Sequence, residues 1–120
     1  MNNVLARSQR YVITYEFEIA LLSGVGWRGM GWRPVNIGDF YGNPFCALID
    51  SAERWCIVGG CGLILYYLHA PFQPYSYHTD TPQWVEWFRS PPDVLWIDNV
   101  YQVDPDTVRF VVDPYSSGAG

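Results

Sequence analysis

Three cysteines and two histidines are the residues of this chain that could carry nucleophilic chemistry. A cysteine becomes an effective nucleophile when a neighbouring histidine activates and orients its thiolate. Cys46, Cys56 and Cys61 fall in segments that we expect to be strands, whereas His69 and His78 fall in an expected loop. This arrangement permits a thiol–imidazole contact without requiring one. A Cys/His-dependent enzyme therefore stays an alternative, and we expect the chain itself to catalyse no reaction.

The same side chains match no common pattern of metal ligands. Zinc sites usually pair ligands a few residues apart, whereas Cys56 and Cys61 are separated by a glycine pair and are followed only distantly by the histidines. An odd number of cysteines also cannot be fully paired within one chain. We expect buried free thiols, with neither a metal ion nor a cofactor.

Sequence motifs for other chemistry are missing as well. The chain contains no Gly-x-Ser-x-Gly elbow, no His-Glu-x-x-His helix, no calcium loop and no lysine for a phosphate loop. Asp104 and Asp106 flank a proline in an expected turn, where carboxylates favour turn formation over acid–base work. The Gly-Trp-Arg triplets at Gly26 and Gly31 favour packed tryptophans beside solvated arginines, and the alternative is that the Trp-Arg pairs stack or bind an anion.

The elements that would position these residues centre on the stretch from Phe45 to Leu68. Its apolar runs are rich in β-branched and aromatic residues and are separated by polar or glycine turns, which predicts consecutive strands of an antiparallel meander. Both faces of these strands are apolar. The resulting sheet must therefore be covered on both sides by the flanking segments.

The flanking segments carry further strand patterns. Residues 11–19 alternate apolar and polar side chains with the period of a half-buried strand, and residues 94–103 and 107–112 predict a hairpin around the turn 104–106. The six glycines of residues 24–42 predict an irregular loop, or short strands broken by bulges.

One short helix is expected around residues 82–89. Three prolines make the preceding segment 69–82 an extended surface loop, whose aromatic side chains either contact a partner or fold back onto the sheet. Asp80 and Pro82 then form a helix-start signal, and Trp84, Trp87 and Phe88 would share one helical face. The chain is thus predicted to be one mainly β domain, residues 1–120, with its meander forming a sandwich or a partly open barrel.

Charge is distributed unevenly along the chain, whose net charge is −5. Residues 1–38 hold four arginines against two acids, a balance of +2, whereas residues 39–120 hold three arginines against ten acids, a balance of −7. An acidic field of this kind repels nucleic acid and attracts a basic partner. The chain also lacks an apolar run long enough to span a membrane and an N-terminal signal pattern, so we expect a cytoplasmic protein.

Two stretches, Ser51 to Leu68 and Asp104 to Pro114, together resemble small acidic immunity proteins of bacterial toxin–immunity pairs, including those of contact-dependent growth inhibition. The resemblance implies a protein that binds a cognate basic toxin in the cytoplasm, as a monomer or 1:1 complex, and covers its active site, such as that of a nuclease. The alternatives are a small-ligand-binding β-domain and the Cys/His enzyme. The residues expected to contact the toxin are acidic or aromatic: Tyr75, Tyr77, Asp80, Trp84, Glu86, Asp93, Asp98, Asp104 and Asp106.

Overall fold

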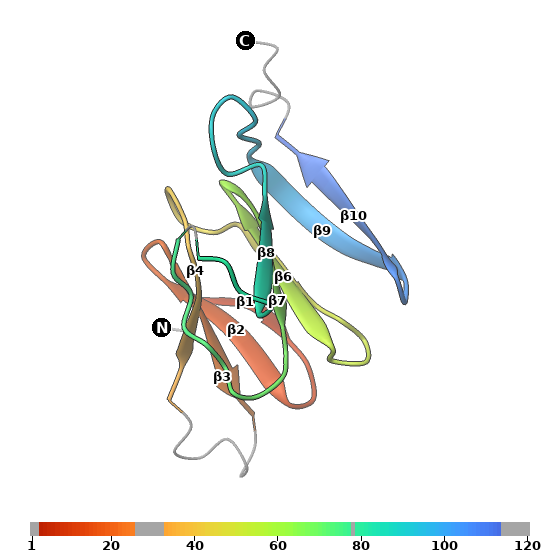
Figure 1. Cartoon of the computed structure of the whole chain (residues 1–120). Coiled ribbons are helices and arrows are strands. Elements are labelled where there is room, and N and C mark those ends of the chain that lie inside the picture. Colours follow the sequence, from red (N-terminus) through yellow and green to blue (C-terminus); the bar gives the residue numbers. More distant parts are fainter. Residues whose placement is uncertain (1–2, 26–32, 78, 114–120) are drawn as a thin grey trace.

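The computed structural model describes residues 3–25, 33–77 and 79–113, which form three antiparallel sheets (Figure 1). The first sheet has the strand order β1 (Val4–Arg7), β2 (Tyr11–Glu16), β3 (Ile19–Gly24) and β4 (Val35–Asp39). The second has the order β5 (Cys46–Ile49), β6 (Trp55–Gly60), β7 (Gly62–Tyr67) and β8 (Trp84–Trp87). The third is the hairpin of β9 (Ile97–Asp104) and β10 (Thr107–Val112). The prediction of a mainly β fold is confirmed, and the described sheets do not close into a barrel.

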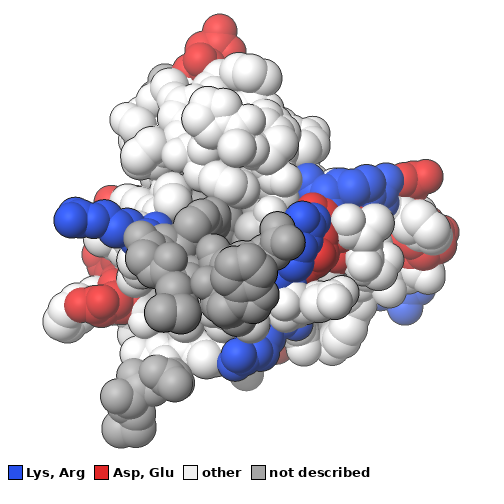
Figure 2. Space-filling view, turned by 90° about the horizontal axis from the view of Figure 1, so that it is seen from below, with Lys and Arg blue, Asp and Glu red and all other residues white. Residues whose placement is uncertain are grey.

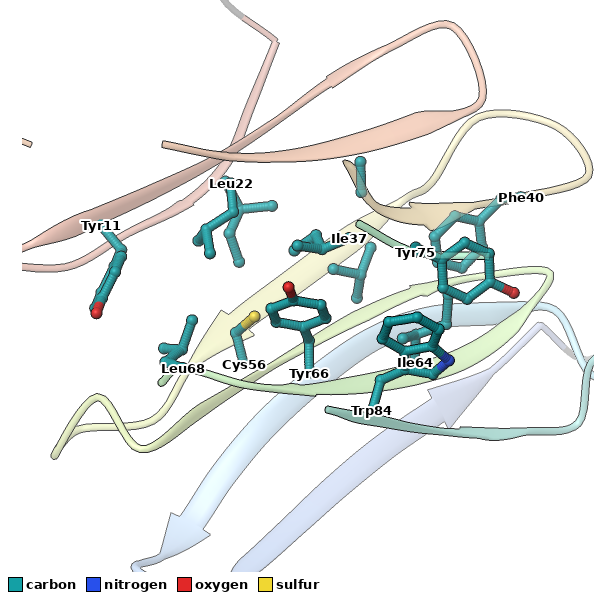
Figure 3. Close-up of a cluster of buried hydrophobic side chains, with 13 residues drawn as sticks. Tyr11, Leu22, Ile37, Phe40, Cys56, Ile64, Tyr66, Leu68, Tyr75 and Trp84 are labelled. Atoms are coloured by element: carbon teal, nitrogen blue, oxygen red, sulfur yellow. The ribbon is translucent and has the colours of Figure 1, made fainter. Parts of the chain in front are cut away.

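The second sheet lies between the other two, which explains why its strands are apolar on both faces. One face packs against the first sheet, where Leu22 and Ile37 point toward Cys56 and Tyr66 (Figure 3). Alternate residues of the same strands point to the opposite face, because successive side chains of a strand alternate in direction. There they meet the third sheet in a cluster that includes Cys46, Ile57, Leu63, Ile97 and Val100.

The expected strand 11–19 is instead the beginning of a hairpin. Tyr11 and Ile13 do point into the core, as the alternation predicts. The chain then turns, because Glu16 pairs with Ile19 across a tight turn in which Phe17 has a φ of 55° and is 80% exposed. The aromatic residue at position 17 therefore marks the turn, although it continues the period of two.

The helix predicted around residues 82–89 is wrong, because this segment forms strand β8. Tyr66 pairs with Trp84 and Leu63 pairs with Trp87, so the backbone of residues 84–87 hydrogen-bonds to the edge of β7. Residues three apart in a strand point to opposite faces. Trp84 is accordingly buried, whereas Trp87 is 42% exposed.

The loop of residues 69–82 folds back over the open side between the first and second sheets. The backbone amide of Tyr75 donates to the carbonyl of Asn36 on β4 at 2.8 Å. The buried Gln83 accepts from the amide of Gln73 at 3.1 Å and donates to the carbonyl of Tyr67 at 2.7 Å. These bonds hold the loop against the core, whereas His78 lies outside the described residues.

The glycine-rich region and the C-terminal hairpin can also be compared with their predictions. The glycine-rich region contains the short strand β4, whose pairing with β3 shifts register at Ala20 and Leu21, while residues 26–32 with most of the repeated triplet lie outside the described residues. The predicted C-terminal hairpin forms with its turn as expected, although β9 begins at Ile97. No helix in the described ranges is long and apolar enough to cross a membrane.

Candidate functional site

Two adjoining hollows open on the surface where Phe40 and Tyr75 end the main core, and we call them together the acidic hollow. Tyr77 and Arg89 line both of them. The larger encloses about 600 Å³ and the smaller about 270 Å³. Their polar walls are dominated by four carboxylates, those of Glu18, Asp39, Glu86 and Asp93.

Segments far apart in the sequence bring these carboxylates together. Glu18 lies in the turn between β2 and β3, and Asp39 is the last residue of β4. The carbonyl of Glu18 accepts from the amide of Phe40 at 2.8 Å, and its carboxylate accepts from the amide of Gly42 at 2.8 Å. The turn is thereby fixed against the end of β4. Glu86 then reaches the same place from the edge strand β8.

The buried guanidinium of Arg89 forms the floor of the acidic hollow. Its Nε lies 2.7 Å from a carboxylate oxygen of Glu86, and its Nη1 donates to the carbonyl of Cys61 at 3.0 Å. Its Nη2 donates to the carbonyl of Asp39 at 2.5 Å, and its plane lies 4.6 Å from the ring centre of Phe40. In the described part of the chain no other cation lines the hollow. The charge of Glu86 is thus balanced, and the other three carboxylates leave the hollow negative.

Tyr75 and Trp84 build the wall of this site from inside the core. The hydroxyl of Tyr75 donates to Glu86 at 2.6 Å. Burial is the main cause that raises the pKa of Tyr75, and this hydrogen bond is the second. The guanidinium of Arg89 lies over the rings of both Phe40 and Tyr75, and the ring centre of Trp84 lies 5.2 Å from that of Tyr75. Both residues are nearly fully buried. They therefore do not form the exposed anchors that the sequence suggested, because they fill the space between β4 and β8.

The exposed aromatic rings at the rim are Tyr41 and Tyr77. Tyr41 is 77% exposed and packs its ring on Trp96, while the hydroxyl of Tyr77 lies 3.0 Å from the hydroxyl of Ser90. A tyrosine face beside carboxylates attracts a cation through its π electrons as well as through charge. The acidic hollow is therefore suited to receive a basic side chain.

The structure brings together only some of the residues that the sequence indicated. Tyr75, Tyr77, Glu86 and Asp93 line the acidic hollow. The remaining carboxylates are exposed elsewhere, with Asp80 on the loop 69–82 and three on or beside the third sheet, namely Asp98, Asp104 and Asp106.

Basic and acidic side chains also mix on the surface. Asp106 makes an ion pair of 3.3 Å with Arg54. In the view of Figure 2, arginines lie directly beside acids, and a broad lobe carries almost no charge. On the face seen in this view, acidic side chains are therefore interspersed with arginines and do not form one uniform acidic area. Local features such as the acidic hollow must supply any selective contact.

Sequence reasoning missed Glu18, Asp39 and Tyr41. Each lies at the end of a strand or in the turn that follows one, where exposed polar residues are ordinary. Only the pairing of β3 with β4, which sets Ile19 opposite Asp39, indicates that they are neighbours. No local signal in the sequence links them to Glu86, because β4 and β8 belong to different sheets.

The three thiols are buried and form no disulfide. Burial raises the pKa of Cys46 to about 11 and raises those of Cys56 and Cys61 as well. Such thiols contain little thiolate at neutral pH and are poor nucleophiles. His69 is exposed and stacks on Tyr67, with ring centres 6.4 Å apart. Among the described residues, no group of three histidine, cysteine or acidic side chains is placed to hold a metal ion.

Comparisons of the chain with protein-family models, curated proteins and solved structures find no match.

Proposed function

We propose that this chain is an immunity protein that binds and neutralises a cognate basic toxin domain in the cytoplasm. The observation that carries the proposal is the acidic hollow, in which Glu18, Asp39 and Asp93 lie beside the exposed rings of Tyr41 and Tyr77. Neutralisation would require no catalytic step by the chain. It would act by occupying the toxin surface on which the toxin's own substrate must bind.

The hollow supports this function through its shape and its charge. A lysine or arginine side chain of the toxin would enter between the two tyrosine rings and meet carboxylates at the rim. The floor cation, Arg89, is held by Glu86 and by backbone carbonyls, so it is not free to bind a second anion. Opposite charges would speed the encounter, and the aromatic rings would add affinity once water is displaced.

The test begins with the neighbouring reading frame, which the proposal expects to encode a basic toxin domain, and co-expresses that domain with the chain. We expect the chain to restore growth of cells that produce this domain and to form a complex with the purified domain. The association rate should fall as salt rises, because counterions screen the attraction between the two proteins. A chain that neither restores growth nor binds the domain would contradict the proposal.

Two double variants of equal charge change identify the contact surface. Glu18→Gln with Asp39→Asn removes two carboxylates from the acidic hollow, and Asp98→Asn with Asp104→Asn removes two from the third sheet. All four residues are exposed, so all four substitutions should be compatible with folding. We expect the first variant to slow association and weaken the complex more strongly than the second. The reverse order would place the contact on the third sheet.

A further inference from the structure

The third sheet covers only part of the outer face of the second sheet. On β7 and β8, Leu63 pairs with Trp87 and Leu65 pairs with Val85, so these four side chains share the face that looks toward the hairpin. Leu63 is buried beneath the hairpin. Val85 and Trp87, however, are 39% and 42% exposed. An apolar strip along β8 therefore lies beyond the hairpin.

An apolar groove of about 460 Å³ marks the boundary of this covered area. Its floor includes Leu63 and Leu65, and one wall is Trp87. The opposite wall consists of Val108 and Phe110 on the inner face of β10. The groove thus runs between the edge strand of the second sheet and the edge strand of the third.

Strand β10 faces this groove with a free edge. Within the part of the chain that the structure describes, β10 pairs with β9 alone. The ring centres of Phe110 and Phe88 lie 5.8 Å apart, which places β10 on the side of the hairpin nearer to β8. β9 in turn packs on β5 and β6. Among the described residues, no strand occupies the position beside β10 on the side of the groove that Trp87 lines.

We propose that an extended segment of a partner protein binds here by adding a strand to β10. Its backbone would pair with the free N–H and C=O groups of that edge, and every second side chain would point down onto Leu65, Val85 and Trp87. This surface adjoins the smaller part of the acidic hollow at Trp87 and Phe88. The proposal rests on the edge of β10 and on the apolar strip, however, and does not depend on the function proposed above.

Charge favours such a segment over a second copy of this chain. Asp93 lines the small hollow that shares Trp87 and Phe88 with the groove, so a segment with a basic residue at this end would be matched, whereas Asp106 at the other end is already paired with Arg54. A second copy would bring its own net charge of −5 to this acidic end, and its binding is one outcome of the test.

The experiment selects binders from a phage-displayed library of random short peptides and measures the affinity of the enriched peptides. We expect apolar residues at every second position. Val85→Lys should weaken binding by at least about tenfold, because it places a charge under the bound strand. The matched control is Val111→Lys, at a residue that is 40% exposed on the outward face of β10, and this change should leave affinity nearly unaltered. Trp87→Ala provides a second variant of the strip.

Hydrogen exchange distinguishes strand addition from simple adsorption. Bound peptide should slow the exchange of backbone amides in residues 107–112, because those that point outward become hydrogen-bonded. Enrichment without an alternating pattern, or equal binding by the two lysine variants, would overturn the proposal. Peptide binding that leaves these amides unprotected would also overturn it, because it would indicate a pocket for apolar groups alone. Self-association of the free protein through β10 would overturn it as well.

Discussion

The buried carboxylate of Asp50 accepts a hydrogen bond from Nε of Arg54 at 2.6 Å, and this pair joins the second sheet to the third. The other carboxylate oxygen of Asp50 accepts from the side-chain amide of Gln102 on β9 at 2.7 Å. Arg54 continues to the hairpin turn, where it donates to the carbonyl of Pro105 and pairs with Asp106. One buried charge therefore positions the hairpin over the face that it covers.

Replacing this carboxylate should destabilise the fold. We expect Asp50→Ala to lower the free energy of unfolding by about 2 kcal/mol, because it removes charged hydrogen bonds from a buried site and leaves the side-chain nitrogen of Gln102 without its acceptor. Urea denaturation followed by tryptophan fluorescence measures the change. Asp98→Ala, at an exposed carboxylate, is the control and should stay within about 0.5 kcal/mol of the parent chain. Equal losses in the two variants would show that the buried pair of Asp50 and Arg54 stabilises the fold no more than an exposed carboxylate does.

Stability should also fall at acid pH through Asp50 and Glu53. The hydrogen bond from Arg54 is the main cause that lowers the pKa of Asp50. Burial would raise the pKa of Glu53, but hydrogen bonds from Ser8 and Arg10 outweigh it and lower the pKa. Both carboxylates bind protons more readily in the unfolded chain, where their pKa values are about 4. Their contribution is therefore present above about pH 5 and is lost as the pH falls below about 4.

Urea denaturation at pH 7, 5 and 3 tests this dependence. The parent chain should lose free energy of unfolding between pH 5 and pH 3, and Asp50→Asn should lose less over the same interval. Parallel losses in the two proteins would assign the acid sensitivity to other groups.

Gly62 should tolerate no side chain. Its φ is +88°, and an added Cβ would lie 2.7 Å from the carbonyl oxygen of Trp87 and 2.8 Å from that of Phe88. Both contacts are with backbone, so β7 and the end of β8 would have to separate. We expect Gly62→Ala to cost about 3 kcal/mol. Gly42 is the matched control, because its φ is +83° but the nearest atom to an added Cβ is 3.8 Å away, and Gly42→Ala should cost about 1 kcal/mol.

The thiols should be protected in the folded protein. Cys46, Cys56 and Cys61 are all buried, and burial raises their pKa values. At pH 8 we expect them to react with Ellman's reagent on the order of a hundredfold more slowly than in urea, because reaction requires both opening and ionisation. A thiol that reacts at the unfolded rate in the native protein would contradict the placement of that cysteine.

Sequence patterns predicted the central strands because their information is local. The apolar runs between Phe45 and Leu68 are separated by a polar turn and a glycine turn, and β5, β6 and β7 follow these divisions. Apolar residues on both faces also required two covering layers, which the first and third sheets provide. The C-terminal hairpin could be predicted in the same way, because a turn that contains Pro105 separates two strand patterns.

Pairing between distant segments decided what local patterns could not. Trp84, Trp87 and Phe88 have helical spacing, yet residues 84–87 form a strand because their backbone pairs with the edge of β7. Hydrogen bonds along a sheet edge outweigh a weak helix-start signal in a segment this short.

The sequence by itself determined a β fold with an apolar central sheet and an acidic second half, because strand alternation, turn residues and charge are properties of neighbouring positions. Only the tertiary structure decided that Glu18 and Asp39 meet Glu86 and Asp93 around Arg89, and that β10 stops short of β8. Those relationships depend on which strands pair and how the sheets stack. Each depends on the packing of the whole chain and cannot be predicted from any single segment.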